Sequence, residues 1–303
     1  MRKFSVATTA SMILLVLIWG LCWHIYKVSL AYTPPLLFAG MRALIGGLLL
    51  SVFLLPRWRS INWRKNWPKY SISALLNIVF NYGCQTAGLT YLPGGLISVL
   101  VYFQPVLIGL FSWMWLGERM SVLKVAGLII GFLGVLAVSI DGITGQVSII
   151  GVILALITAI SWTLGVIYVK KERDNVDSLW MVAFQCIIGG AVLLGLGSGT
   201  ESWSNITWNT TYLVGLGFGV TFGVPIAFVI YYKLVNEGDA SKVASFTFLV
   251  PLIAVVTGAV FMKEPLTYSL LTGLILIVAS IYCVNYPGRK VEKPLPAKIT
   301  YGS

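Results

Sequence analysis

The sequence predicts an all-α membrane protein with ten transmembrane helices, arranged as two inverted five-helix repeats. Three observations support this fold class: a composition too apolar for a soluble domain, an internal repeat, and a one-sided distribution of lysine and arginine. Of the 303 residues, 58% are hydrophobic and only 10% are charged, whereas about a quarter of the residues are charged in typical soluble domains. Such a composition predicts many apolar spans of roughly 20 residues each.

The apolar stretches occur ten times and leave no room for a soluble domain. They predict helices over residues 6–27, 35–55, 70–90, 95–116, 122–139, 149–169, 178–197, 211–233, 241–262 and 267–286. The first stretch is similar to a signal peptide. It ends at Trp23 to Lys27 without a small-residue cleavage site, so we expect it to stay as a transmembrane helix. We expect the polar segment 287–303 to be a disordered cytoplasmic tail.

An internal repeat divides the chain into two copies, residues 6–139 and 149–286. Three matched pairs lie 146 positions apart: Pro105 with Pro251, Glu118 with Glu264, and Gly127 with Gly273. Earlier in each copy the offset is 143, as between Trp19 and Trp162. Because each copy holds an odd number of helices, the second copy must run upside down relative to the first. Inverted repeats are typical of secondary transporters, whose halves rock between two mirror-related arrangements.

Lysine and arginine indicate the orientation of the chain in the membrane. With the N-terminus inside, 18 of the 21 basic residues fall in inside segments; Lys27 and Lys263 lie outside, and Arg42 lies within the second helix. This bias predicts a multi-pass protein of the cell (plasma) membrane with both termini cytoplasmic. The basic residues occupy short links rather than one face, so the net charge of +11 does not indicate a nucleic-acid partner.

The motifs together resemble those of a known transporter family. Trp19-Gly20 stands in the first helix, Phe38 to Arg42 reads Phe-Ala-Gly-Met-Arg in the second, and the Pro…Glu…Gly frame occurs twice. In these features the chain resembles the EamA-type drug/metabolite transporters. The resemblance implies two EamA repeats, cytoplasmic termini, and transport of small metabolites, often amino acids and often as efflux. One departure is Lys263, since the family usually has a small residue before the second glutamate.

Charged residues inside the predicted spans are functional candidates, and Arg42 is the one that the sequence offers. It could be a counter-charge for an anionic group such as a substrate carboxylate. Alternatively, it could extend outward to the membrane surface or bond to a helix-end carbonyl. The matching position in the second copy is Gln185, so the repeat does not require a charge there.

Three amides recur on one face of the predicted third helix. Asn77, Asn81 and Gln85 are spaced four residues apart, and Tyr82 follows directly after Asn81. Because amides facing lipid are costly, we expect this face to point into the bundle. It would either line a wet cavity or join one helix to another.

Repeat-matched aromatic residues are the other candidates for substrate binding. Trp19 matches Trp162 at the offset of 143, and Tyr102 matches Phe248 at the offset of 146. Many membrane Trp and Tyr residues are only interfacial anchors. A cavity with aromatic walls and a few amides suits an amphipathic organic solute better than an inorganic ion.

The matched prolines and glutamates suggest how the halves are shaped and joined. Pro105 and Pro251 lie within predicted spans, where each removes a backbone donor. They could be flexible points of a gating movement or static kinks. Glu118 and Glu264 lie beside basic residues at helix ends, which favours helix capping or ion pairing over a role in transport.

These features predict a secondary transporter that moves small organic metabolites by alternating access, with amino acids as candidates and efflux as the expected direction. A lipid or lipid-linked-group flippase, or another non-enzymatic membrane subunit, is the alternative. Without a phosphate-binding loop, span carboxylates or clustered ligands, we expect no catalytic residues, no cofactor, no metal and no enzyme activity. We also expect weak dependence on pH gradients, and a monomer or weak homodimer in the lipid bilayer.

Overall fold

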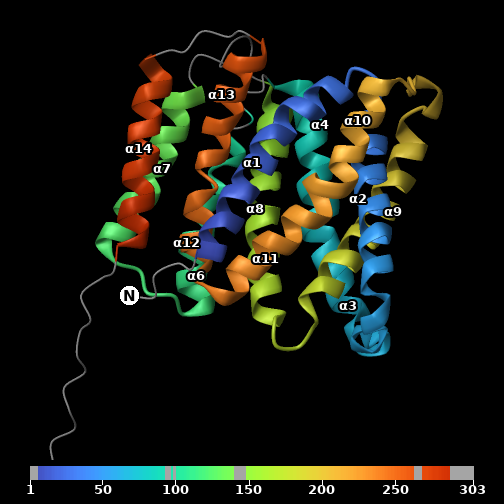
Figure 1. Ribbon diagram of the computed structural model, residues 1–303, viewed down its shortest axis with the longest axis horizontal. Helices are drawn as coiled ribbons and strands as arrows, with labels where there is room; N and C mark the ends of the chain where they lie inside the picture. Colours follow the sequence, from blue (N-terminus) through green and yellow to red (C-terminus); the bar gives the residue numbers. More distant parts are fainter. Residues whose placement is uncertain (1–5, 93–96, 98–99, 140–147, 263–267, 287–303) are drawn as a thin grey trace, which may run out of the picture.

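A computed structural model describes residues 6–92, 97, 100–139, 148–262 and 268–286. These residues form an all-helical bundle without strands (Figure 1). The first half comprises α1 (Val6–Ser29), α2 (Pro35–Leu54), η1 (Leu55–Ile61), α3 (Trp63–Ala74), η2 (Leu75–Gly83), α4 (Cys84–Tyr91), α6 (Gln104–Leu116) and α7 (Val122–Ser139). The second comprises α8 (Ile149–Glu172), α9 (Ser178–Thr200), η4 (Trp203–Asn205), α10 (Thr210–Phe218), η5 (Gly219–Ile226), α11 (Ala227–Glu237), α12 (Ala240–Phe246), α13 (Leu249–Met262) and α14 (Tyr268–Asn285).

The helices confirm the predicted class of a multi-pass membrane protein. Five are long and apolar enough to cross a bilayer: Val6–Ser29, Pro35–Ile61, Ile149–Glu172, Ser178–Thr200 and Thr210–Glu237. Shorter apolar helices cover Gln104–Leu116, Val122–Ala137, Ala240–Ala254 and Leu271–Asn285. Among the described residues, the third predicted span is represented by the continuous helical segment from α3 through η2 to α4. Many large apolar side chains on the outer surface are exposed, as lipid contact requires.

The two halves pack about a pseudo-twofold axis, so that matched helices meet each other. α2 packs against α9 at one edge of the bundle and α7 against α14 at the other, with α1 and α8 between them (Figure 1). Glycines allow the backbones of α2 and α9 to approach closely. A Cβ atom at Gly47 would meet the backbone of Ile187, and one at Gly190 would meet the backbone of Leu44. Both 187−44 and 190−47 equal 143, the offset of the repeat.

The fourth and ninth predicted helices are interrupted by a turn, which the sequence analysis did not anticipate. The turns comprise residues 102–103 and 247–248, which lie 145 positions apart. Pro105 is consequently near the start of α6 and Pro251 near the start of α13, rather than in the middle of a continuous span. Proline has no N–H to donate and its fixed φ suits the first turn of a helix, so a new helix begins there readily.

The third and eighth spans each contain a π-helical segment at matched positions. η2 lies between α3 and α4, and η5 lies between α10 and α11. π-Helical turns are rare and are frequently found at functional sites, because the wider turn frees backbone groups and redirects side chains. In η5, Pro225 removes one of the N–H groups that an α-helix would need.

Glu118, in the link between α6 and α7, joins the two halves at one face of the bundle. Its Oε1 accepts hydrogen bonds from Lys170 Nζ at 3.0 Å and from the Ala240 amide at 2.6 Å. Its Oε2 lies 3.3 Å from Lys124 Nζ and accepts from the amide and hydroxyl of Ser241. The side chain is only 6% exposed. Glu118 thus caps α12 and pairs with two lysines, as the sequence favoured; Glu264 lies outside the described residues.

The environment of Glu118 favours its charged form. Burial alone would raise the pKa of the carboxyl group, but Lys170, the Ser241 hydroxyl and Lys124 outweigh burial and lower the pKa below its ordinary value of 4.5. A carboxyl group whose pKa is lowered by folding stabilises the folded state fully above its ordinary pKa. That contribution is lost as the pH falls through the lowered value.

We predict that Glu118→Gln lowers the melting temperature in detergent by several degrees at neutral pH. The substitution leaves Lys124 and Lys170 without their anion, which costs roughly 3 kcal/mol or more when the pair is buried. The melting temperature of the unsubstituted protein should also fall on acidification below pH 4.5, and that of the variant should fall less.

Asp239→Asn is the matched control, because Asp239 pairs with Lys242 beside the same short helix but both side chains are over a third exposed. An exposed pair contributes little, so this variant should melt near the unsubstituted protein. Equal losses in the two variants, or parallel acid profiles with and without Glu118, would contradict the assignment.

Candidate functional site

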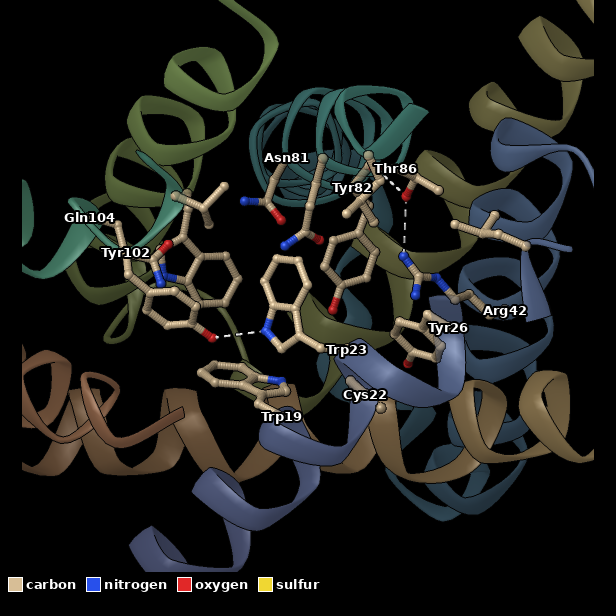
Figure 2. Close-up of a pocket in the computed structure, with 16 residues that line it drawn as sticks. Trp19, Cys22, Trp23, Tyr26, Arg42, Asn81, Tyr82, Thr86, Tyr102 and Gln104 are labelled. Atoms are coloured by element: carbon tan, nitrogen blue, oxygen red, sulfur yellow. Dashed lines mark hydrogen bonds between the residues drawn. The ribbon is translucent and has the colours of Figure 1, made fainter. Parts of the chain in front are cut away.

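A cavity of about 80 Å³ is lined mainly by the first half of the chain, and Trp162 and Gly223 of the second half complete its described lining. Side chains from α1, α2, η2, α4, α6 and α8 surround it, together with the turn before α6 and Gly223 of η5 (Figure 2). The volume accommodates several water molecules at about 15 Å³ each. The described lining is aromatic and amide-rich, with a single charged side chain.

Two matched tryptophans meet at the centre of the bundle. The ring centroids of Trp19 and Trp162 are 5.5 Å apart and the planes cross at 77°. Tyr231 packs against both, at 5.2 Å from Trp19 and 5.3 Å from Trp162. Trp19 and Trp162 are equivalent in the repeat, so the pseudo-twofold axis passes near this contact. The edge-to-face arrangement is one that aromatic rings prefer.

Arg42 projects from α2 into one end of the cavity and is only 2% exposed (Figure 2). Its Nη2 lies 3.5 Å from the Thr86 hydroxyl oxygen, at the outer limit of a hydrogen bond. The Arg42 Nε and Nη1 atoms have no hydrogen-bond partner among the described residues. None of the ion pairs in the described part of the chain includes Arg42. A cation buried without a counter-charge is costly, so its surroundings need an explanation.

Aromatic rings hold the Arg42 guanidinium on several sides. Its central carbon is 4.1 Å from the ring centroid of Tyr26, 4.7 Å from that of Tyr82 and 5.2 Å from that of Phe38. Cation–π contacts of this kind partly compensate for lost hydration, by about 0.5–2 kcal/mol each. They orient the planar group but leave its N–H edges free to donate. The sequence left open that Arg42 bonds to a helix-end carbonyl. The described hydrogen bonds of Arg42 include no such carbonyl.

The opposite end of the cavity is formed by Tyr102 and Gln104, and Trp23 lies between Tyr102 and the middle of the cavity (Figure 2). The Trp23 indole N–H donates to the Tyr102 hydroxyl at 3.3 Å. Asn81 lies between the two ends, and its Nδ2 donates to the Thr158 carbonyl of α8 at 3.2 Å. This bond uses the donor side of the Asn81 amide and leaves its oxygen as an acceptor on the cavity side.

Most of the residues that the sequence singled out for binding line this cavity. They are Trp19, Arg42, Asn81, Tyr82, Gln85, Tyr102 and Trp162. Their role in binding remains a prediction. The three-amide face therefore divides: Asn81 and Gln85 border the cavity, whereas Asn77 does not.

The structure does not bring Asn77 and Phe248 to the cavity. Asn77 lies one turn deeper, where a side chain at Gly165 would meet its amide, and it joins helix to helix instead. Phe248 packs against Gly131 in an apolar cluster with Val250 and Ile277, and this cluster reaches the cavity only through Tyr102, Trp19 and Trp23. Both side chains are fully buried. Their counterparts in the other copy, Gly223 and Tyr102, line the cavity, so matched positions have different surroundings in the two copies.

Further lining residues were missed by the sequence analysis. Cys22, Trp23 and Tyr26 line the cavity from α1, Thr86 from α4 and Gln104 from α6. The signal for the α1 residues was available, since Trp19, Trp23 and Tyr26 follow the i, i+4, i+7 spacing of one helix face. Gly223 could not be recognised, because it has no side chain of its own to signal a role and Tyr26 packs directly against its backbone. In the described residues, no group of three or more His, Cys, Asp or Glu could hold a metal ion.

Comparison with known proteins identifies the family of this chain. The EamA-like transporter family matches residues 8–140 and again residues 149–286. The uncharacterized transporter YvbV of Bacillus subtilis is 52% identical over 286 residues, which cover 94% of each chain. A protein of Escherichia coli named "probable amino-acid metabolite efflux pump" is 28% identical, over 93% of this chain and 95% of its own.

A solved crystal structure of a protein shares the fold, with a TM-score of 0.80 at 21% sequence identity, over 95% of this chain and 99% of its own. At this identity the likeness concerns the fold alone. The repeated match and the full-length relative establish that the chain belongs to the EamA-like transporter family.

Proposed function

We propose that the protein is a secondary transporter that carries small organic metabolites across the cell membrane by alternating access. The observation that carries this proposal is the cavity bordered by the matched pair Trp19 and Trp162, one residue from each half. A site near the pseudo-twofold axis of an inverted repeat can be reached from either side when the halves exchange their arrangements. Amino acids are the first candidates, since one relative is named as an amino-acid metabolite efflux pump.

The closed face of the bundle supports alternating access. Trp162 precedes Lys170 by eight residues on α8, or about 12 Å along the helix. The cavity is thus separated from one face by roughly two helical turns and by the Glu118 network, which joins both halves. In the proposed cycle, this network opens when the opposite end of the cavity closes.

The proposed orientation places the Glu118 face in the cytoplasm. Figure 1 shows α1 beginning and α14 ending at the same face of the bundle. Of the 21 basic residues, 18 fall in segments on the inner side when the N-terminus is cytoplasmic. Both termini would then be cytoplasmic in the plasma membrane, and export of metabolites is the proposed direction. The working unit would be a monomer or a weak homodimer.

A lipid flippase remains the second candidate, favoured only by the buried cation that could meet a head-group phosphate. A flippase needs a lateral opening and charged groups for the lipid head group, whereas Arg42 is the single charged side chain in the described lining of the cavity. An enzymatic role is not proposed, since the family and the named relatives are transporters.

We predict that purified protein in liposomes catalyses counterflow of small amino acids and that Trp162→Phe weakens it. The smaller ring loses part of the contact with Trp19 and with a bound solute, so the half-saturating concentration should rise roughly threefold to tenfold. Trp113→Ala is the control, because Trp113 is exposed on the outer surface of α6. Counterflow that is absent for all metabolites and for labelled lipid in the unsubstituted protein would refute the transporter proposal.

We also predict that solute-driven uptake responds little to an imposed pH gradient. The described residues that line the cavity include no Asp, Glu or His that could carry a coupled proton. The measurement is the initial rate of uptake in proteoliposomes with and without a gradient of one pH unit, at fixed solute concentrations. An obligatory dependence on the gradient would contradict this prediction.

A further inference from the structure

The pseudo-twofold axis relates Arg42 to Gln185, and the side chains around these two residues differ. Gln185 lies 143 positions after Arg42 and is fully buried on α9. Its Oε1 accepts from the Ser73 hydroxyl at 2.6 Å and lies 3.4 Å from Asn77 Nδ2. The Tyr232 hydroxyl lies 3.5 Å from the same amide. The side chains of the protein itself therefore fill this position and satisfy Gln185.

The same construction surrounds Arg42, but two of its side chains are missing. At the offset of 146, Tyr232 corresponds to Thr86, which is the hydrogen-bond neighbour of Arg42. At this offset Ser73 corresponds to Gly219 and Asn77 to Gly223.

These two glycines carry no polar group where their counterparts Ser73 and Asn77 do, and the side chains of Tyr26 and Arg42 pack against them instead. A Cβ atom at Gly219 would lie 3.2 Å from the Arg42 Cβ, and one at Gly223 would meet the Tyr26 hydroxyl. The polar atoms that would satisfy a residue at position 42 are therefore absent, and Gly223 borders the cavity.

We propose that Arg42 forms a carboxylate-binding site for the transported solute. Arg42 lines the cavity, and its buried Nε and Nη1 atoms have no partner among the described residues. A carboxylate matches the planar guanidinium with two parallel hydrogen bonds. The inference rests on the proposed function, because it takes the cavity to be the solute's binding site.

The rest of the cavity defines the solute further. Trp19, Trp23 and Tyr102 offer aromatic surfaces to an apolar body, and the described lining contains no carboxylate to pair with an ammonium group. The required group is therefore the carboxylate, and an α-amino group is tolerated near the amide oxygens rather than required. The class is small apolar monocarboxylates, including α-amino acids, and excludes the corresponding amines.

The first experiment compares matched trios of solutes built on three body sizes. Each contains an amino acid, the acid without its amino group and the amine without its carboxylate: alanine, propanoate and ethylamine; valine, 3-methylbutanoate and 2-methylpropylamine; phenylalanine, 3-phenylpropanoate and 2-phenylethylamine. The readouts are the melting temperature of purified protein and competition in counterflow.

In at least one trio, both carboxylates should bind and the amine should not. Equal binding of the amine would overturn the inference while leaving transport intact. If no trio binds although other solutes are exchanged, the inference is also overturned. If no solute of any kind is exchanged, the proposed function fails, and the inference with it.

The second experiment separates a binding role of Arg42 from a structural one. Arg42→Met removes an uncompensated buried charge, so without solute its melting temperature should equal or exceed that of the unsubstituted protein. Its affinity for carboxylates should fall roughly tenfold to a hundredfold. Arg42→Lys keeps the charge but lacks the planar guanidinium that makes two parallel hydrogen bonds, so its loss of carboxylate affinity should be intermediate. A large drop in melting temperature in both variants, with unchanged affinity in Arg42→Lys, would show that Arg42 is structural.

The third experiment restores a counterpart of Ser73. Gly219→Ser places a hydroxyl beside Arg42 and narrows the space, so carboxylate affinity should fall severalfold. Gly217→Ser is the matched control two residues earlier, because a Cβ atom there would meet nothing within 4 Å. Unchanged affinity in Gly219→Ser, or an equal loss in both variants, would count against the proposed site.

Discussion

The hydrocarbon core of a membrane provides no water to polar groups, and the interior of this bundle is arranged around that constraint. Each buried donor or acceptor must find a partner in the protein, in a wet cavity or in a bound solute. Threonines within α8 satisfy their hydroxyl groups inside their own helix: Thr158 donates to the Leu154 carbonyl and Thr163 to the Ala159 carbonyl. Gln185 meets this requirement through Ser73 and Asn77. Arg42 meets it only in part, and the open cavity lies beside it.

Some matched positions of the two repeats have the same role in packing, whereas others have different surroundings. The matched glycines Gly47 and Gly190 let α2 and α9 pack closely in the same way from both sides. Trp19 and Trp162 meet where the two halves meet. The positions around Arg42 and Gln185 depart from this symmetry, because one is filled with polar side chains and the other is lined by glycine. One copy thus satisfies this position with its own polar side chains, whereas the other leaves Arg42 only partly satisfied beside the cavity.

The network around Glu118 has a different physical basis, since it lies in a link and not within a span. A carboxylate at the start of α12 meets free backbone N–H groups and two lysines, so burial there is compensated in full. Its partners come from both halves of the chain. The network therefore joins the two halves at one face of the bundle through a small number of groups.

The sequence by itself determined the fold class, the repeat and the helices, because hydrophobic length and periodicity are local properties. The family followed from motifs that are also local, such as Trp19-Gly20 and the twice-used Pro…Glu…Gly frame. Repeat matching also singled out Trp19 and Trp162, since residues related by a twofold axis can meet at that axis.

Only the tertiary structure decided which polar side chains face the cavity. Asn77 and Asn81 are alike in type and spacing, yet Gly165 gives Asn77 a place against α8 while Asn81 borders open space. Tyr102 and Phe248 are equivalent in the repeat, yet only Tyr102 lines the cavity. The direction in which Arg42 extends and the close packing of Tyr26 on Gly223 likewise depend on neighbours from distant parts of the chain. Burial and satisfaction are set by such neighbours, and no spacing within one helix encodes them.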